Sequence, residues 1–185
     1  MRMSGDLRIF RNYTQVRYLF FIAMILISAG CTNAPDKTVH NDKPGNADME
    51  NLNRYLIQKD RERIQNYIER KNLKMSQSPS GLWYQILKEG EGDLFKDNSR
   101  IKMTYECSML DGTLCYSSDK LGPKELILGR STMEPGLNEG LRLLRPGAEA
   151  VFILPPFLAY GLPGDGKMIP PRAVIVYKVN ILRPE

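Results

Sequence analysis

The stretch IKMTYECSMLDGTLCYSS, residues 101–118, decides the fold of this chain. Over its first nine residues apolar side chains alternate with more polar ones, and this period of two predicts a half-buried strand. Tyr105 and Cys107 lie on the inward face of that strand. Asp111-Gly112 is typical of a tight hairpin turn, so residues 113–118 are predicted to form the return strand of an antiparallel pair.

The loop length of this hairpin decides whether its two cysteines can meet. A two-residue loop pairs Cys107 with Tyr116 and puts Cys107 and Cys115 on opposite faces. A three-residue loop with a bulge at Gly112 pairs Cys107 with Cys115 and permits a disulfide. The residues alone leave both registers open.

The residues that follow the hairpin predict the rest of an α+β domain. Residues 126–128 form a short apolar run. A short helix begins near Pro135 and ends before Pro146-Gly147. Residues 150–154 are typical of a buried strand, and residues 173–181 alternate as a last strand. The helix is predicted to turn three leucines toward the core: Leu137, Leu141 and Leu144. We therefore expect an antiparallel sheet with one short helix in its concavity.

An amphipathic helix is predicted at residues 49–75, before the domain at residues 76–185. Its apolar side chains recur at helical spacing among many charges, and they are Leu52, Tyr55, Leu56, Ile64, Tyr67 and Ile68. This stripe can dock on the helix's own domain or form a helix-mediated dimer. We favour docking, because it buries the stripe without a second chain.

The first 30 residues have the pattern of a lipoprotein signal peptide. Residues 18–30 are uncharged, and 13 residues suit the apolar part of an export signal better than a membrane span of about 20. Ser-Ala-Gly then precedes Cys31, as in a bacterial lipobox. We expect a lipid on Cys31 that anchors the chain in the bacterial cell envelope, with the domain outside the cytoplasm. The alternative is a plain secretory peptide.

Residues 31–48 are rich in polar residues and contain two prolines, so they predict a flexible tether. Because the export signal directs the chain out of the cytoplasm, Cys107 and Cys115 would mature in an oxidising compartment, where disulfides persist.

The composition excludes several classes of function. Lys and Arg number 26 against 21 Asp and Glu, but after residue 31 the balance is 22 against 20. The body therefore lacks the basic field that nucleic-acid binding needs. His40 is the single histidine, which argues against a His-based catalytic triad and a His-rich metal site. We expect no metal and no cofactor.

Short motifs follow one another in a fixed order over about residues 82–183. They are Met103-Thr104-Tyr105, Asp111-Gly112, Tyr116-Ser117-Ser118, residues 135–140 (PGLNEG), Pro146-Gly147, Ala159-Tyr160-Gly161 and Ile169-Pro170-Pro171. This ordered set resembles the FKBP-type peptidyl-prolyl isomerases. The preceding helix, residues 81–84 (GLWY) and the lipobox resemble the FKBP-like lipoproteins of gliding bacteria and their non-gliding relatives. The resemblance implies a sheet wrapped around one short helix.

The resemblance also implies an apolar proline-binding pocket. Its catalytic positions match Tyr105, Tyr160 and Tyr177, and the Tyr160 hydroxyl would donate to a carbonyl of the bound peptide. Its substrate-binding positions match Cys115, Tyr116, Leu126, Met133, Glu134, Leu137 and Ile169. At Glu134 the family uses the backbone N–H as a donor.

Four of these positions depart from the family pattern. Leu137 replaces the tryptophan of the pocket floor, and Cys115 and Leu126 replace wall phenylalanines. Tyr116 replaces an aspartate that normally accepts a hydrogen bond from the Tyr105 hydroxyl. The pocket is expected to stay apolar while losing aromatic surface.

Two functions follow from the resemblance. One is a prolyl isomerase that assists the folding of exported proteins by binding proline-containing segments. The other is a catalytically weak FKBP module that binds such segments as a chaperone or envelope assembly factor. The intact Ala-Tyr-Gly and Ile-Pro-Pro motifs favour the enzyme, and the altered wall favours the binding module.

Overall fold

The computed structural model describes residues 45–183. The predicted signal peptide, Cys31 and most of the predicted tether lie outside these residues. Within residues 45–183, no helix is both long and apolar enough to cross a membrane.

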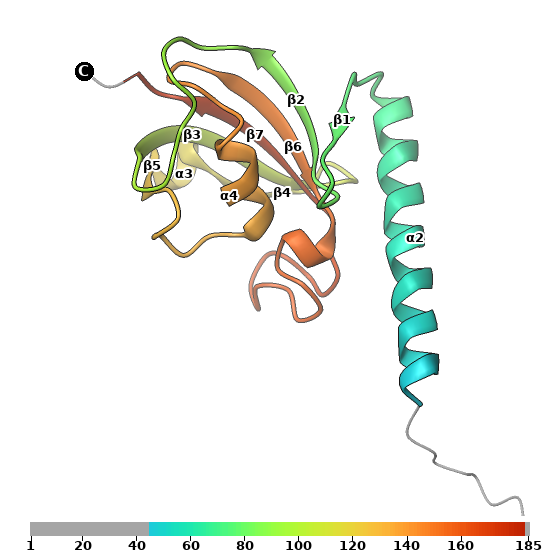
Figure 1. Cartoon of the computed structure of the whole chain (residues 1–185). Coiled ribbons are helices and arrows are strands. Elements are labelled where there is room, and N and C mark those ends of the chain that lie inside the picture. The colour runs from blue at the N-terminus through green and yellow to red at the C-terminus, as the bar shows by residue number, and fades with distance from the viewer. Residues whose placement is uncertain (1–44, 184–185) are drawn as a thin grey trace, which may run out of the picture. The chain divides into compact units, whose positions relative to one another are not determined.

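A single antiparallel sheet forms the body of the domain (Figure 1). The described strands run in the order β1-β2-β6-β7-β3-β4, and β5 pairs with the other end of β3. Their bounds are Ser76–Gln77 for β1, Trp83–Lys88 for β2, Arg100–Met109 for β3, Leu114–Ser117 for β4, Lys124–Ile127 for β5, Glu149–Leu154 for β6 and Ile175–Ile181 for β7. The long central pairs β3–β7 and β6–β7 hold the sheet together and confirm the predicted α+β class.

One short helix, α4 (Pro135–Leu141), lies on the concave side of this sheet (Figure 1). Its leucines pack into the main core, where Leu137 and Leu141 are fully buried. Leu144 is buried with them but follows the helix, which ends earlier than Pro146-Gly147 suggested. Gly140 lets the helix approach the sheet, because a Cβ there would stand 2.8 Å from the Phe152 ring.

The hairpin between β3 and β4 takes the register that keeps the cysteines apart. Cys107 pairs with Tyr116, and a bulge then pairs Ser108 with Leu114. Cys107 is buried, Cys115 is partly exposed, and both are free. Neither predicted register holds throughout. The Met109 N–H donates to the Thr113 carbonyl across a three-residue loop, as in the second register, but a bulge at Cys115 restores the Cys107–Tyr116 pair of the first. The two cysteines therefore do not pair.

The N-terminal helix α2 runs from Asn46 to Arg70, so it begins three residues inside the predicted tether and ends before residue 75. Only its C-terminal half packs on the sheet, where Ile64 joins a second apolar cluster with Val151, Ile153, Val174 and Val176. Leu52 and Tyr55 stay exposed. The predicted stripe therefore docks over half of its length, and its N-terminal half carries no partner among residues 45–183.

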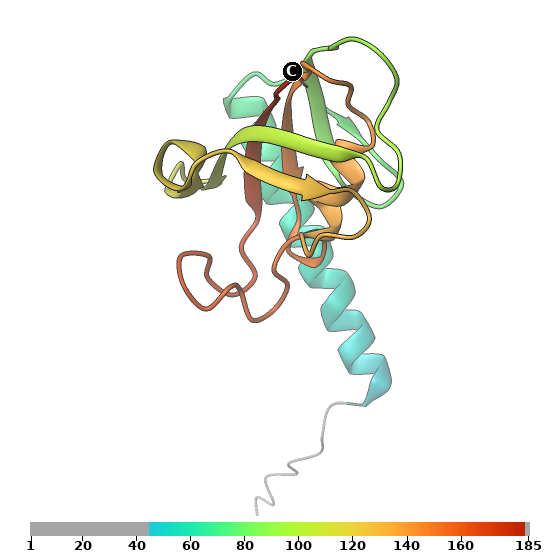
Figure 2. The same cartoon turned by 90° about the vertical axis from the view of Figure 1, so that its left-hand side faces the viewer.

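A long loop joins the 3-10 turn η1 (Pro156–Leu158) to β7 and extends away from the sheet in both views (Figures 1 and 2). The short helix α3 (Ser118–Leu121) follows β4. Neither α3 nor η1 was anticipated from the sequence, since four and three residues are too short to set up a period.

Candidate functional site

Three tyrosines come together from separate parts of the fold. Tyr105 stands on β3 and Tyr177 on the neighbouring β7, with ring centroids 6.3 Å apart and planes tilted by 49°. Tyr160 follows η1. All three contact the main core, and Tyr177 is only 2% exposed. The structure thus brings together the three residues predicted as catalytic.

The Glu134 side chain joins these tyrosines. Its Oε1 accepts a hydrogen bond from the Tyr177 hydroxyl at 2.7 Å and a second one from the Tyr160 hydroxyl. Its Oε2 is buried without a hydrogen-bond partner, and the residue is 6% exposed. The expected pocket was apolar and used the backbone N–H of Glu134, and the sequence did not predict a buried Glu134 carboxylate among the tyrosines.

The position of Glu134 follows from the start of α4. Glu134 has extended backbone angles immediately before the helix, and Pro135 occupies the first helical position, where no N–H is needed. Gly136 packs tightly, since a Cβ there would lie 2.7 Å from Leu154. The helix is therefore pressed against the core, and the side chain before it points among the tyrosines.

The tyrosine hydroxyls remain donors in this environment. Burial and the Glu134 carboxylate raise the pKa of Tyr160 and of Tyr177 far above the ordinary value. Burial, with Cys107 and Glu134, also raises the pKa of Tyr105. Burial raises the pKa of the Cys107 thiol to about 12, so this cysteine is a packed side chain rather than a nucleophile.

The predicted apolar lining is largely part of the core. Leu137, Leu126 and Ile169 are each at most 3% exposed and belong to the same cluster as Tyr177. Met133 is partly exposed and packs against that cluster. A leucine at the floor position is thus closely packed against its neighbours, and the site has less aromatic surface than the family pattern implies.

Cys115 and Tyr116 form a rim beside the long loop. The Cys115 Sγ lies 3.8 Å from the Met168 carbonyl oxygen. The Tyr116 hydroxyl donates to the carboxylate of Asp165. Tyr116 therefore has a partner in the loop, whereas the aspartate that it replaces would have served Tyr105.

Asp165 organises the loop, and sequence reasoning missed it. Its Oδ1 accepts hydrogen bonds from the backbone N–H groups of Lys167 and Ile169, each at 2.8 Å. Although desolvation opposes the shift, these bonds and the Tyr116 hydroxyl leave the pKa of Asp165 below its ordinary value. The Gly-Asp-Gly sequence of residues 164–166 was the available signal, because aspartate between glycines is typical of such turns.

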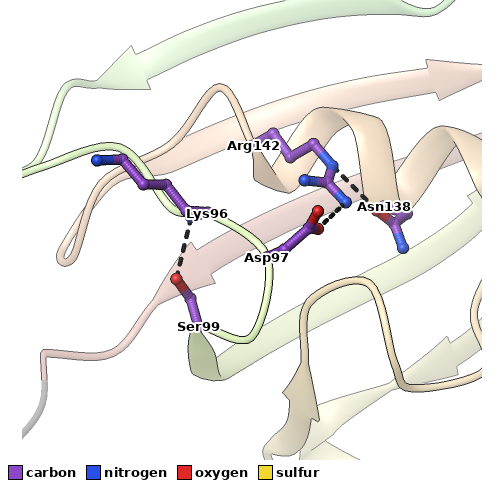
Figure 3. Close-up of polar contacts among 5 residues, drawn as sticks. All are labelled: Lys96, Asp97, Ser99, Asn138 and Arg142. Carbon is purple, nitrogen blue, oxygen red and sulfur yellow. Dashed lines mark hydrogen bonds and ion pairs between the residues drawn. The ribbon is translucent and has the colours of Figure 1, made fainter.

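A second missed contact fixes the outer side of α4 (Figure 3). The Arg142 guanidinium donates from Nη2 to Oδ1 of Asp97 at 2.5 Å and from Nε to Oδ1 of Asn138 at 3.2 Å. In the same loop, the backbone N–H of Lys96 donates to the Ser99 hydroxyl at 3.0 Å. These bonds tie α4 to the loop before β3 and so hold the helix that carries Leu137.

Among residues 45–183, no group of three or more His, Cys, Asp or Glu side chains is placed to hold a metal ion. The site itself presents buried tyrosine hydroxyls, one carboxylate and apolar walls.

Comparisons with known proteins agree with this geometry. A family model described as FKBP-type peptidyl-prolyl cis-trans isomerase matches residues 92–182. A probable FKBP-type isomerase, FkpA, of Neisseria meningitidis is 36% identical over 104 residues, which are 56% of this chain and 38% of that protein. The isomerase Mip of Coxiella burnetii is 33% identical over 103 residues, which are 56% of this chain and 44% of that protein. The chain thus spans less than half the length of these two relatives.

Solved structures show the same fold. FkpA from Escherichia coli superposes with a TM-score of 0.60 and 26% identity, over 72% of this chain and 62% of that one. The N-terminal domain of FKBP42 from Arabidopsis thaliana gives a TM-score of 0.55 and 25% identity, over 60% of this chain and 91% of that one. With the motif order, the wrapped sheet and the tyrosine cluster, these matches show that residues 92–182 form a domain of the FKBP-type peptidyl-prolyl cis-trans isomerase family.

Proposed function

We propose that this protein is a peptidyl-prolyl cis-trans isomerase that assists the folding of exported proteins. The observation that carries the proposal is the convergence of Tyr105, Tyr160 and Tyr177 on buried Leu137 and Ile169, in a domain of the FKBP family. The substrates are polypeptide segments that contain proline.

The reaction needs neither a nucleophile nor a cofactor. Rotation about a prolyl peptide bond has a barrier of roughly 20 kcal/mol, because amide resonance is lost at the twisted geometry. A twisted amide is less polar than a planar one, so dry apolar walls favour it over water. A hydroxyl such as that of Tyr160 holds a flanking carbonyl by a hydrogen bond during the rotation.

An isomerase assay on the full chain tests this proposal. The chain, extracted in mild detergent, should accelerate the cis-to-trans isomerisation of an Ala-Leu-Pro-Phe peptide in a protease-free assay. Tyr160→Phe should lower kcat/KM about tenfold, as expected for the loss of one hydrogen-bond donor. Tyr55→Phe on exposed α2 serves as the control and should leave kcat/KM unchanged.

A second function is favoured by two observations. The Tyr160 hydroxyl already donates a hydrogen bond to the Glu134 carboxylate. Cys115 and Leu137 are also smaller than the aromatic residues that the family has at these positions. The second proposed function is therefore that of a catalytically weak FKBP module, which binds proline-containing segments as a chaperone or envelope assembly factor. Suppression of aggregation of an unfolded protein without any acceleration of prolyl isomerisation would establish this second function.

We also propose that a lipid on Cys31 anchors the chain in the bacterial cell envelope. The support is the apolar run at residues 18–30 and the small residues before Cys31. Mass spectrometry of the native protein should find a diacylated or triacylated N-terminal cysteine, and Cys31→Ser should release the chain from the membrane fraction. A Cys31→Ser chain that stays membrane-bound would refute this anchor.

A further inference from the structure

Glu134 is a buried carboxylate without a cationic partner. Both groups bonded to it are neutral tyrosine hydroxyls, and both bond to Oε1. Its Oε2 has no partner, and no ion pair of residues 45–183 involves Glu134. A carboxylate in such a place is costly to desolvate, and a cation that reaches it removes most of that cost.

The surroundings of Glu134 also suit a cation. The rings of Tyr105 and Tyr177 lie beside it, and aromatic faces attract cations. The Tyr105 ring already has one cation nearby, since the Lys124 ammonium lies 6.0 Å from its ring centroid. Asp165 adds a second carboxylate at the rim, bonded to Tyr116. The site and its rim therefore combine carboxylates with aromatic rings.

The same carboxylate stands in the way of a neutral substrate. Glu134 accepts the hydrogen bond of the Tyr160 hydroxyl, which a substrate carbonyl would otherwise receive. The carboxylate also fills space beside Tyr177. A neutral Xaa-Pro segment has to break this bond and returns no charged interaction to Glu134. A segment with a basic side chain supplies a charge-assisted hydrogen bond in exchange.

We propose that Glu134 makes this site selective for Xaa-Pro segments in which the residue before the proline is Lys or Arg. The basic group pairs with the Glu134 carboxylate and draws it away from the Tyr160 hydroxyl. That hydroxyl then donates to the substrate carbonyl, and the proline ring enters the space that the carboxylate leaves. This inference rests on the proposed prolyl-binding function and names its substrate class.

The test compares matched peptides on the full chain. The peptides carry Lys, acetyl-lysine, Leu or Glu before the proline, so Lys and acetyl-lysine differ in charge at nearly equal length. Wild type should show kcat/KM about tenfold higher for Lys than for acetyl-lysine, as expected for one charge-assisted hydrogen bond, and the lowest value for Glu. The same order should appear in the equilibrium affinities of these peptides, measured by calorimetry.

Two variants assign the preference to Glu134. Glu134→Gln keeps the shape of the side chain and removes its charge, so the ratio of Lys to acetyl-lysine should fall to near one. Glu62→Gln removes one exposed charge from α2, where Glu62 pairs only with neighbouring side chains, and should keep the wild-type ratio. Equal values for Lys and acetyl-lysine in wild type, or a preference that persists in Glu134→Gln, would overturn the proposal.

The outcomes separate this proposal from the proposed function. Turnover of all four peptides without a charge preference leaves the isomerase and refutes the role of Glu134. Tighter binding of the Lys peptide without turnover supports the role of Glu134 and refutes the isomerase. Neither binding nor turnover of any peptide refutes both. The comparison of Lys with acetyl-lysine needs only wild type, so it holds even where a variant fails to fold.

Discussion

Gly164 shows how one residue without a side chain holds the loop at the rim. It has φ +71°, and a Cβ there would lie 2.3 Å from the carbonyl oxygen of Ile169. Gly166 has the same φ, but a Cβ there would meet nothing within 4 Å. The two glycines therefore share the conformational requirement and differ only in the close backbone approach.

We predict that Gly164→Ala destabilises the chain more than Gly166→Ala does. Gly166→Ala should cost about 1 kcal/mol for the left-handed backbone, and Gly164→Ala at least about 1–2 kcal/mol more for the clash. Urea unfolding of both variants measures the two losses. Equal losses would mean that the loop relaxes freely around Ile169.

The two cysteines of the hairpin also differ from each other in reactivity. Cys107 is fully buried, and burial raises its pKa to about 12, whereas Cys115 is partly exposed. We predict that iodoacetamide at neutral pH modifies Cys115 in the native chain and leaves Cys107 untouched until denaturant is added. Mass spectrometry of the peptides locates the label. A chain in which neither cysteine reacts after denaturation without reductant would contain the disulfide that this register excludes.

At the scale of elements, α2 is fastened to the loop before β7 by a polar contact. Arg172 donates from Nη2 to Oδ2 of Asp60 at 2.7 Å, and Asp60 is only 5% exposed. Arg172 holds φ +57°, which is uncommon for a side-chain-bearing residue. The contact joins residues 112 positions apart and adds a polar attachment to the apolar docking around Ile64.

We predict that Arg172→Met costs about 2–3 kcal/mol, because it leaves the Asp60 carboxylate buried and without its closest cation. The control is Lys178→Met, which breaks the exposed Lys178–Glu106 pair and should cost less than about 1 kcal/mol. Urea unfolding compares the two variants. Similar small losses would show that water replaces Arg172 at Asp60.

The buried Asp60 carboxyl should also make the free energy of unfolding depend on pH. Burial raises its pKa above the ordinary value of 3.8, and Arg172 and Arg63 only partly oppose this. The folded chain therefore holds the Asp60 proton more tightly than the unfolded chain. The stability of wild type relative to Asp60→Asn should rise as pH falls from about 7 toward 4. Urea unfolding of both chains across this range measures the difference, and a flat or falling difference would contradict the raised pKa.

At the scale of the whole molecule, the N-terminal half of α2 is an open apolar surface. Met49, Leu52 and Tyr55 lie on one side of the helix and are 45–57% exposed, whereas the half around Ile64 is docked. Docking on the chain's own domain therefore uses only part of the predicted stripe. The rest is available for the helix-mediated dimer that the sequence left as the alternative.

We predict a reversible dimer of the full chain through this surface. Sedimentation equilibrium should give a dimer for wild type and a monomer for the double variant Leu52→Glu with Tyr55→Glu, because charges on the shared face repel each other. Leu87→Glu changes an equally exposed leucine on β2 and should leave the dimer intact. A wild-type chain that stays monomeric at high concentration would contradict the predicted dimer.

The sequence by itself determined the sheet, the helix in its concavity and the family. Alternation over residues 101–109, the Asp111-Gly112 turn and the apolar run at 150–154 are local patterns, and β3, the β3–β4 hairpin and β6 follow them. The motif order also identified Tyr105, Tyr160 and Tyr177, which the fold then brought together.

Only the tertiary structure decided the polar character of the site. Glu134 bonds to tyrosines 26 and 43 residues away, and Asp60 bonds to Arg172 across 112 residues. A local sequence pattern predicts strands, helices and turns, but it does not predict which distant side chain a buried residue will contact. The packing of α4 against the sheet and the loop buries the Glu134 carboxylate. A buried carboxylate needs hydrogen-bond donors, and the two tyrosine hydroxyls supply them.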